Sequence, residues 1–211
     1  MNILKKLNAE RVNIVEADGT LKMSLYSSGH NPPAMMDGAD IFPGHRDGSG
    51  ASGIRFYNTE GDECGGMSFQ SEKKEDGGYS SSLHFSFDQY KNDQVITMTS
   101  NETNGERQYG FTVYDRPDEH LIETVNLRYA MINAGNENDS GEVERLENVY
   151  KEKNVKRMWL GKTPDGVVSL KINDSKGRER VRVCFDPENG ENISLFDEAG
   201  GAIYALRANA D

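Results

Sequence analysis

A short pattern of apolar and polar residues recurs along the chain. Two apolar residues lie two positions apart, Asn or Asp follows two positions later, and glycine follows three positions after that. The pattern occurs at residues 54–61, 170–177 and 193–200, and in altered form at 12–19 and 183–190. Apolar residues two apart share one face of a strand, Asn or Asp opens a turn, and glycine closes the turn in the left-handed conformation. Each copy therefore predicts a strand that leads into a β-hairpin turn.

Alternating apolar and polar residues extend this hairpin pattern over most of the sequence. They predict strands at about 79–87, 94–100 and 107–114, and a meander of about five strands between residues 158 and 206. We therefore expect a mainly β fold of repeated β-hairpins, a meander that closes into a barrel- or sandwich-like structure. The last three pattern glycines are unevenly spaced, which makes a β-solenoid or an intertwined trimer the second choice.

The hydrophobic period changes after Arg116 and Pro117. Apolar residues then recur at helical spacing, which predicts a two-helix insert at residues 118–154. Asp118 and Glu119 would lie in the first turn of the first helix, and the second helix is expected at about 142–153 with Ser140 as its N-cap. The chain accordingly divides into three regions within one domain overall: an N-terminal β-hairpin region (1–117), the helical insert (118–154) and a C-terminal β-meander (155–211).

Each predicted helix has an apolar stripe that we expect to contact the protein core. These stripes comprise Leu121, Ile122, Val125, Tyr129 and Ile132 in the first helix, and Val143, Leu146, Val149 and Tyr150 in the second.

The composition limits the partners that the protein can have. The 211-residue chain carries a formal charge of −11, and 35% of its residues are hydrophobic. A net negative field repels phosphate backbones, so nucleic acid is not expected as a partner. So little apolar material in a chain with many turns predicts a thin core, or a core that is completed by oligomerisation.

The cysteines and the N-terminal sequence indicate the cellular compartment in which we expect the protein. Cys64 and Cys184 lack the close spacing of a metal site or redox pair, and we expect both to be reduced. The N-terminal sequence contains no long apolar region followed by a small-residue cleavage site, and no stretch approaches the roughly 20 apolar residues of a membrane helix. A cytoplasmic protein without a membrane span is therefore expected.

Two segments contain the residues best suited to bind a ligand. Residues 27–52 form a long loop with two histidines, His30 and His45, and a flexible surface loop is the favoured interpretation. The block from His84 to Gln94 combines histidine, carboxylates and carboxamides, but could equally be a polar loop between two strands. If the two segments form one site, its ligand-binding residues are His84, Asp88, Gln89, Asp93, Gln94 and His45.

The sequence assigns no catalytic residue, cofactor or metal ligand. It contains no nucleophile elbow, phosphate loop, dinucleotide fingerprint or zinc motif. Acidic turns such as NTEGDE and DPENGEN are rich in oxygen atoms that could bind calcium. However, turn chemistry already explains their Asp, Asn and Gly residues, and none of them matches a known calcium loop.

Three sequence blocks, GIRFYNTEGDECGGMSF, LHFSFDQYKNDQVI and GFTVYDRP, stand out from the rest of the chain. Together they resemble a family of uncharacterised bacterial proteins of about this size. Members of that family carry a strand-turn block around an EGxExGG core, then an SFDQYxxDQ block, and then DRP before a helical stretch. The resemblance implies a self-standing bacterial protein, and it brings no known activity, cofactor or site residue.

From these observations we expect a non-enzymatic structural or interaction protein that forms a homo-oligomer. Repeated hairpins present strand edges, which proteins commonly pair or cover. The alternative is an enzyme or small-ligand-binding protein with a site formed by residues 27–52 and the block from His84 to Gln94. Convergence of these two segments on one concave pocket would favour the alternative.

Overall fold

The computed structural model describes residues 5–207, which form one large sheet, one small sheet and two helices. The ends of the first and last predicted regions, residues 1–4 and 208–211, lie outside the described residues. The helices are α1 (Leu121–Asn136) and α2 (Ser140–Lys153). The strands are β1 (Arg11–Val15), β2 (Leu21–Tyr26), β3 (Met35–Met36), β4 (Ala39–Asp40), β5 (Ser52–Tyr57), β6 (Glu63–Lys73), β7 (Tyr79–Asp88), β8 (Gln94–Thr103), β9 (Glu106–Asp115), β10 (Val155–Lys162), β11 (Val168–Asn173), β12 (Glu179–Asp186), β13 (Gly190–Phe196) and β14 (Ala202–Arg207).

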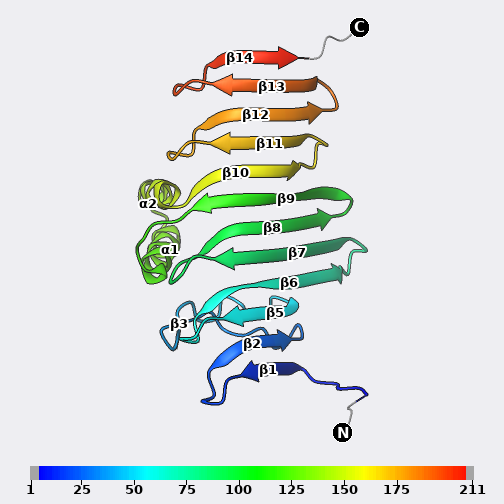
Figure 1. The fold of residues 1–211 in the computed structure, drawn as a ribbon, viewed down its shortest axis with the longest axis vertical. Helices are drawn as coiled ribbons and strands as arrows, with labels where there is room; N and C mark the ends of the chain where they lie inside the picture. The colour runs from blue at the N-terminus through cyan, green and yellow to red at the C-terminus, as the bar shows by residue number, and fades with distance from the viewer. Residues whose placement is uncertain (1–4, 208–211) are drawn as a thin grey trace.

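The large sheet is a 12-stranded antiparallel meander in the order β1-β2-β5-β6-β7-β8-β9-β10-β11-β12-β13-β14. Figure 1 shows these strands side by side in one layer, with nearly parallel axes and with β1 and β14 at opposite ends. The predicted mainly β hairpin meander is confirmed, but closure into a barrel is wrong. Closure requires the two edge strands to meet through tilt and stagger, and here the rest of the sheet separates them.

The recurrent sequence pattern forms the hairpin turns as predicted. Between β5 and β6, the side chain of Asn58 accepts from the backbone N–H groups of Glu60 and Asp62, and the N–H of Gly61 donates to the Asn58 carbonyl. Gly61 has a φ of 84°, a left-handed conformation that glycine adopts without a Cβ clash. The equivalent Gly177 and Gly200 have φ values of 76° and 85°. The pattern therefore determines local structure in both halves of the chain.

The two helices form an excursion from the meander between β9 and β10. These strands pair directly, and in Figure 1 the helices lie beside one end of β7 to β10. α1 begins after His120, whose Nδ1 accepts from the N–H of Ile122. The predicted placement of Asp118 and Glu119 in the first turn is wrong, because both precede the helix and the acidic residue of the first turn is Glu123. No helix among residues 5–207 is long and apolar enough to cross a membrane.

The N-cap of α2 also differs from the prediction. Asp139, not Ser140, caps the helix, because its carboxylate accepts from the N–H of Glu142 and its charge suits a helix N-terminus. The predicted helical stripes are only partly buried. Val125 and Leu146 belong to the core, whereas Tyr129 and Ile132 are exposed.

One face of the large sheet is apolar and open. A row of laterally paired residues crosses every strand of this sheet, and a second row lies two positions along each strand. No apolar side chain of either row is buried. The first row comprises Val12, Leu25, Ile54, Met67, Phe85, Met98, Phe111, Leu160, Leu170, Val183, Ile193 and Leu206, and the second runs from Ile14 to Tyr204, interrupted only by Gly65.

The opposite face of the sheet is mostly polar, and several of its side chains are buried. Buried residues on this face include Ser24, Arg55, Ser86, Thr97 and Thr112. Of the few buried apolar residues, Tyr26 and Tyr57 lie on this polar face, and Val125 and Leu146 lie in the helices. The core of the single chain is therefore thin, and most strand-borne apolar side chains remain outside it.

Candidate functional site

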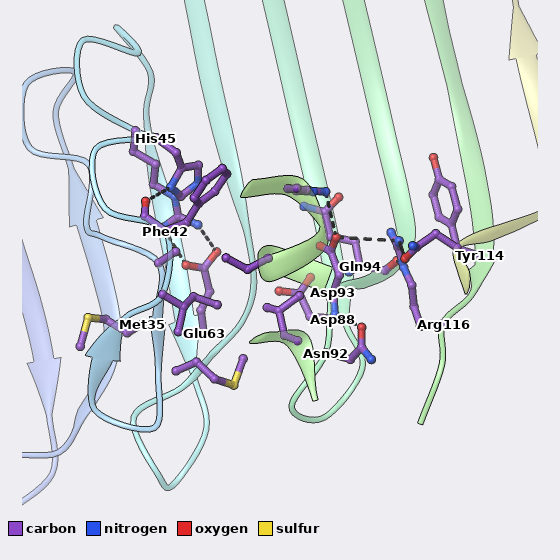
Figure 2. Close-up of a pocket in the computed structure, with 18 of the residues that line it drawn as sticks. Met35, Phe42, His45, Glu63, Asp88, Asn92, Asp93, Gln94, Tyr114 and Arg116 are labelled. Atoms are coloured by element: carbon purple, nitrogen blue, oxygen red, sulfur yellow. Dashed lines mark hydrogen bonds and ion pairs between the residues drawn. The ribbon is translucent and has the colours of Figure 1, made fainter. Parts of the chain in front are cut away.

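One cavity lies where residues 27–52, the β7–β8 turn and the two helices meet. Its volume is about 430 Å³, and residues from six different parts of the chain line it. Figure 2 shows Phe42, His45 and Met35 on one side and Asp88, Asp93 and Arg116 on the other. The apolar residues that line it are Met35, Met36, Ile41, Phe42, Leu121 and Val125, and the charged residues that line it are Arg46, Glu63, Asp88, Asp93, Arg116 and Arg128.

Two β-bulges direct carboxylate and carboxamide side chains toward this cavity. Phe87 pairs with Ile96, but Asp88 pairs with Gln94, so Val95 is an extra residue in β8. Cys64 is an extra residue in β6 in the same way, because Phe56 pairs with Gly65 and Tyr57 pairs with Glu63. A bulge changes which face the residues beyond it occupy. Glu63 and Gln94 therefore share the polar face with Asp88 instead of lying on the apolar face.

The segment between β7 and β8 is a hairpin turn that anchors α1. Asn92 is only 2% exposed, and its side-chain amide donates to the carbonyls of Pro117 and Glu119 at 2.7 Å each. Gln89 Nε2 donates to the carbonyl of Pro117 at 3.1 Å. The carbonyl of Lys91 accepts from the N–H of Leu121 at 2.8 Å, at the start of α1. Much of this block therefore has a structural role that fixes one wall of the cavity.

Two of the three cavity carboxylates are paired with arginines. Glu63 Oε1 accepts a hydrogen bond from Nη2 of Arg46 at 2.8 Å, and Oε2 lies 2.7 Å from Nη1 of the same arginine. Glu63 Oε1 also lies 3.6 Å from Nε of Arg55. Asp93 Oδ2 lies 3.8 Å from Nη1 of Arg116 and 3.5 Å from Nη2 of Arg128. Both acidic groups are therefore held in ion pairs that span separate elements.

The third carboxylate, Asp88, has no ion-pair partner among the described residues. Its Oδ1 atom is buried and accepts no hydrogen bond. Burial raises the pKa of Asp88 to about 7, and the negative charges of Glu63 and Asp93 add to this increase, while Ser86 and Arg55 oppose it. Asp88 therefore changes its charge near neutral pH.

Two histidines near the cavity have lowered pKa values, which favours the neutral imidazole. Burial lowers the pKa of His45, although the hydrogen bond between its Nδ1 and the Phe42 carbonyl, at 2.8 Å, partly opposes this. Burial also lowers the pKa of His84, with a further contribution from the positive charge of Arg55. In a neutral imidazole one ring nitrogen donates a hydrogen bond and the other accepts one, so each histidine offers both a donor and an acceptor.

The structure brings together four of the six residues proposed from the sequence. Asp88, Asp93, Gln94 and His45 line the cavity. His84 and Gln89 do not: His84 lies further along β7 between Ser68 and Thr99, and Gln89 is bonded to Pro117. The other loop histidine, His30, lies elsewhere and contacts Ser27 and Glu10.

Sequence reasoning did not identify three charged residues of the cavity. Arg116 belongs to the DRP motif noted in the sequence, but only the fold shows that it faces Asp93. Arg128 projects from α1, and Glu63 reaches the site because of the bulge in β6. No local sequence signal distinguishes these residues from ordinary surface charges.

A separate acidic cluster of Asp37, Glu60 and Asp62 contains an internal cation. Their oxygen atoms lie within 4.8 Å of one another, as metal ligands would. However, Nζ of Lys91 lies 2.6 Å from Glu60 and 2.7 Å from Asp62, and it also contacts Asp37. The lysine ammonium thus occupies the position that a metal ion would take.

Comparison of the sequence with known protein families gives no match, and comparison with curated proteins gives none. The resemblance to an uncharacterised bacterial family therefore stays a prediction.

Proposed function

We propose that the protein is a non-enzymatic structural or interaction protein that assembles with copies of itself through the apolar face of its large sheet. The observation that supports this proposal is the inverted burial of the sheet. Several polar side chains on one face, among them Ser24, Thr97 and Thr112, are buried, whereas no apolar side chain of the two rows on the other face is.

The open apolar face is too extensive for an isolated soluble chain. Soluble monomers rarely expose contiguous apolar patches larger than a few hundred Å². Here both rows extend from β1 to β14, and exposed members such as Phe56, Phe87 and Leu160 leave 39%, 52% and 49% of their surface open. An antiparallel sheet is stabilised when one face packs against other apolar groups. A second sheet laid on this face would bury both rows.

A copy of the same chain is the partner that fits this surface best. The apolar rows run the full length of the sheet, and a second copy offers a surface of equal length and chemistry. The rows contain no charged residue, so the net charge of −11 on each chain lies outside the contact. Figure 1 also shows little rotation between successive strands, and flat sheets of many strands are usually stabilised by stacking.

The proposal is tested by measuring subunit number with native mass spectrometry and light scattering, with and without a chelator. Wild-type protein is expected to be a homo-oligomer. Ile172→Glu places a charge on the apolar face, where Ile172 is 40% exposed, and should reduce the subunit number. The matched control is Lys171→Glu, because Lys171 is the preceding residue of β11 and lies on the opposite face.

Circular dichroism will verify that both variants keep the sheet. A wild-type protein that is monomeric at all concentrations tested would overturn the proposal, and so would equal behaviour of the two variants. A monomer would instead direct attention to a partner of different sequence.

A second candidate function is the binding of a small ligand in the cavity. The observation that favours it is the convergence of residues 27–52 and the β7–β8 segment on one concave site. Incubating the purified protein with ligand libraries and detecting retained small molecules by mass spectrometry would test this second candidate function directly.

Bacterial origin, cytoplasmic location and the lack of nucleic-acid partners remain predictions from the sequence.

A further inference from the structure

The cavity contains one carboxylate that the described chain does not neutralise. Glu63 and Asp93 are each near two arginines, whereas Asp88 has none within ion-pairing distance in residues 5–207. Oδ1 of Asp88 is buried and accepts no hydrogen bond. A buried carboxylate without an ion-pair partner is costly, and a cationic donor from outside the chain would reduce that cost.

We propose that the cavity binds a small amphipathic amine, whose ammonium group pairs with Asp88 and whose apolar part lies against Met35, Ile41, Phe42 and Val125. This inference rests on the second candidate function and is independent of self-assembly. The volume of about 430 Å³ suits a small molecule with one apolar group.

A cation fits this site better than an anion does. The arginines that line the cavity are already engaged: Arg46 with Glu63, and Arg116 with the Gln94 carbonyl at 2.6 Å and the Asn154 side chain at 2.7 Å. An anion would also lie beside the unpaired Asp88. The charge of −11 on the chain attracts cations over a longer range.

A metal ion and a cation held by aromatic rings are less suitable than an ammonium at Asp88. Calcium takes six to eight oxygen ligands, and Glu63 and Asp93 are already engaged by arginines. The rings of Tyr114 and Tyr150, which could otherwise hold a cation, are covered by the guanidinium groups of Arg116 and Arg128. Asp88 is therefore the recognition group for the cation.

The probe for this test is phenethylamine, and its neutral counterpart is 2-phenylethanol. Binding is followed by NMR of ¹³C-methyl-labelled methionines, which works in large assemblies. Met35 and Met36 line the cavity, whereas Met98 lies on the opposite, apolar face of the sheet and reports non-specific binding. At about pH 8, where Asp88 is mostly ionised, the amine should shift Met35 and Met36 but not Met98.

The alcohol should bind the wild-type protein about 10- to 100-fold more weakly than the amine, because it lacks the charged hydrogen bond. Asp88→Asn should weaken amine binding by a similar factor and leave alcohol binding unchanged. The control variant is Asp118→Asn, which removes an equal charge at an exposed position and should bind like wild type.

Equal affinities for the amine and the alcohol would overturn the inference. So would unchanged amine binding by Asp88→Asn, or tighter binding of the carboxylate analogue 3-phenylpropionate. If the alcohol or the carboxylate shifts Met35 and Met36 while the amine does not, the cavity is a binding site and only the ligand class is wrong. If none of the three probes shifts them, the second candidate function fails as well.

Discussion

Thr97 and Met98 are consecutive residues of β8, yet the polar Thr97 is 5% exposed and the apolar Met98 is 49% exposed. Strand alternation places them on opposite faces of the sheet. Their exposures are the reverse of what a soluble monomer usually shows. The same inversion holds for Ser169, which is 3% exposed, and Val168, which is 45% exposed. In both pairs the exposed apolar residue lies on the face through which we propose that copies of the chain associate.

The first prediction concerns the protection of Met98 from oxidation. If copies of the chain cover the apolar face, hydrogen peroxide should oxidise Met98 more slowly in the wild-type protein than in Ile172→Glu. Met131, which lies on α1, should be oxidised at the same rate in both proteins. Peptide mass spectrometry measures both rates. Equal Met98 rates in the two proteins would contradict a shared interface that extends from β8 to β11.

The second prediction concerns Asp88 and pH. Because its pKa is raised from 3.8 to about 7, the folded state binds more protons than the unfolded state between these values, and stability falls as pH rises through this window. Asp88→Asn removes the effect. Above pH 7 this variant should be more stable than wild type by an amount on the order of 2–4 kcal/mol, and the gain should vanish near pH 4.

Denaturant titrations at matched protein concentration measure this difference, since association also changes apparent stability. A variant that is less stable than wild type at about pH 8 would show that the Asp88 carboxylate has a stabilising partner.

The third prediction concerns the connection between the β7–β8 turn and α1. Asn92→Ala leaves the buried carbonyls of Pro117 and Glu119 without their donor, and should cost about 2–4 kcal/mol of unfolding free energy. Asn126→Ala, at an exposed position of α1, should change stability by less than about 0.5 kcal/mol. Urea denaturation compares the two variants, and equal effects would argue against the anchoring role of Asn92.

The fourth prediction concerns Lys91 and its three carboxylates. Lys91→Gln should lower the melting temperature at neutral pH, because Asp62 is 1% exposed and would lose its counter-charge. Hydrogen bonds from Lys91 are the main cause of the lowered pKa values of Asp37 and Glu60. Their contribution is present above the usual carboxylate pKa and is lost as pH falls, so the difference between the two proteins should shrink below about pH 4.

Calorimetry at several pH values measures this difference. A chelator should leave the wild-type melting temperature unchanged, since Lys91 occupies the acidic cluster. A drop in melting temperature with chelator would instead indicate a bound metal ion.

The hairpins were predictable from sequence because their signal is local. Gly61, Gly177 and Gly200 sit in turns whose hydrogen bonds involve residues three or four positions away. The open sheet was not predictable, because alternation gives the two faces of each strand and not the twist or the pairing of the edge strands. The helix starts were misplaced by one to three residues because His120 and Asp139 compete with neighbouring capping residues.

The candidate site was predictable only in part. The composition of the polar block around Asp88 and of the loop around His45 indicates candidate ligand-binding residues, but the proximity of the two segments depends on the packing of the loop on the sheet. Glu63 reaches the cavity through a bulge, and the position of a bulge is set by cross-strand register. The ion-pair partners of Asp93 are Arg116, directly after β9, and Arg128 in α1, and a single sequence does not show that these segments lie beside the β7–β8 turn.

Each strand of the large sheet pairs only with the strands of this sheet that precede and follow it along the chain. An additional hairpin would therefore add two strands to the sheet. A gene that duplicates or deletes one hairpin would lengthen or shorten the sheet while leaving the other pairings in place. The number of hairpins that the gene encodes therefore sets the length of the apolar face. Related chains with more or fewer hairpins would therefore form larger or smaller assemblies through the same kind of apolar contact surface.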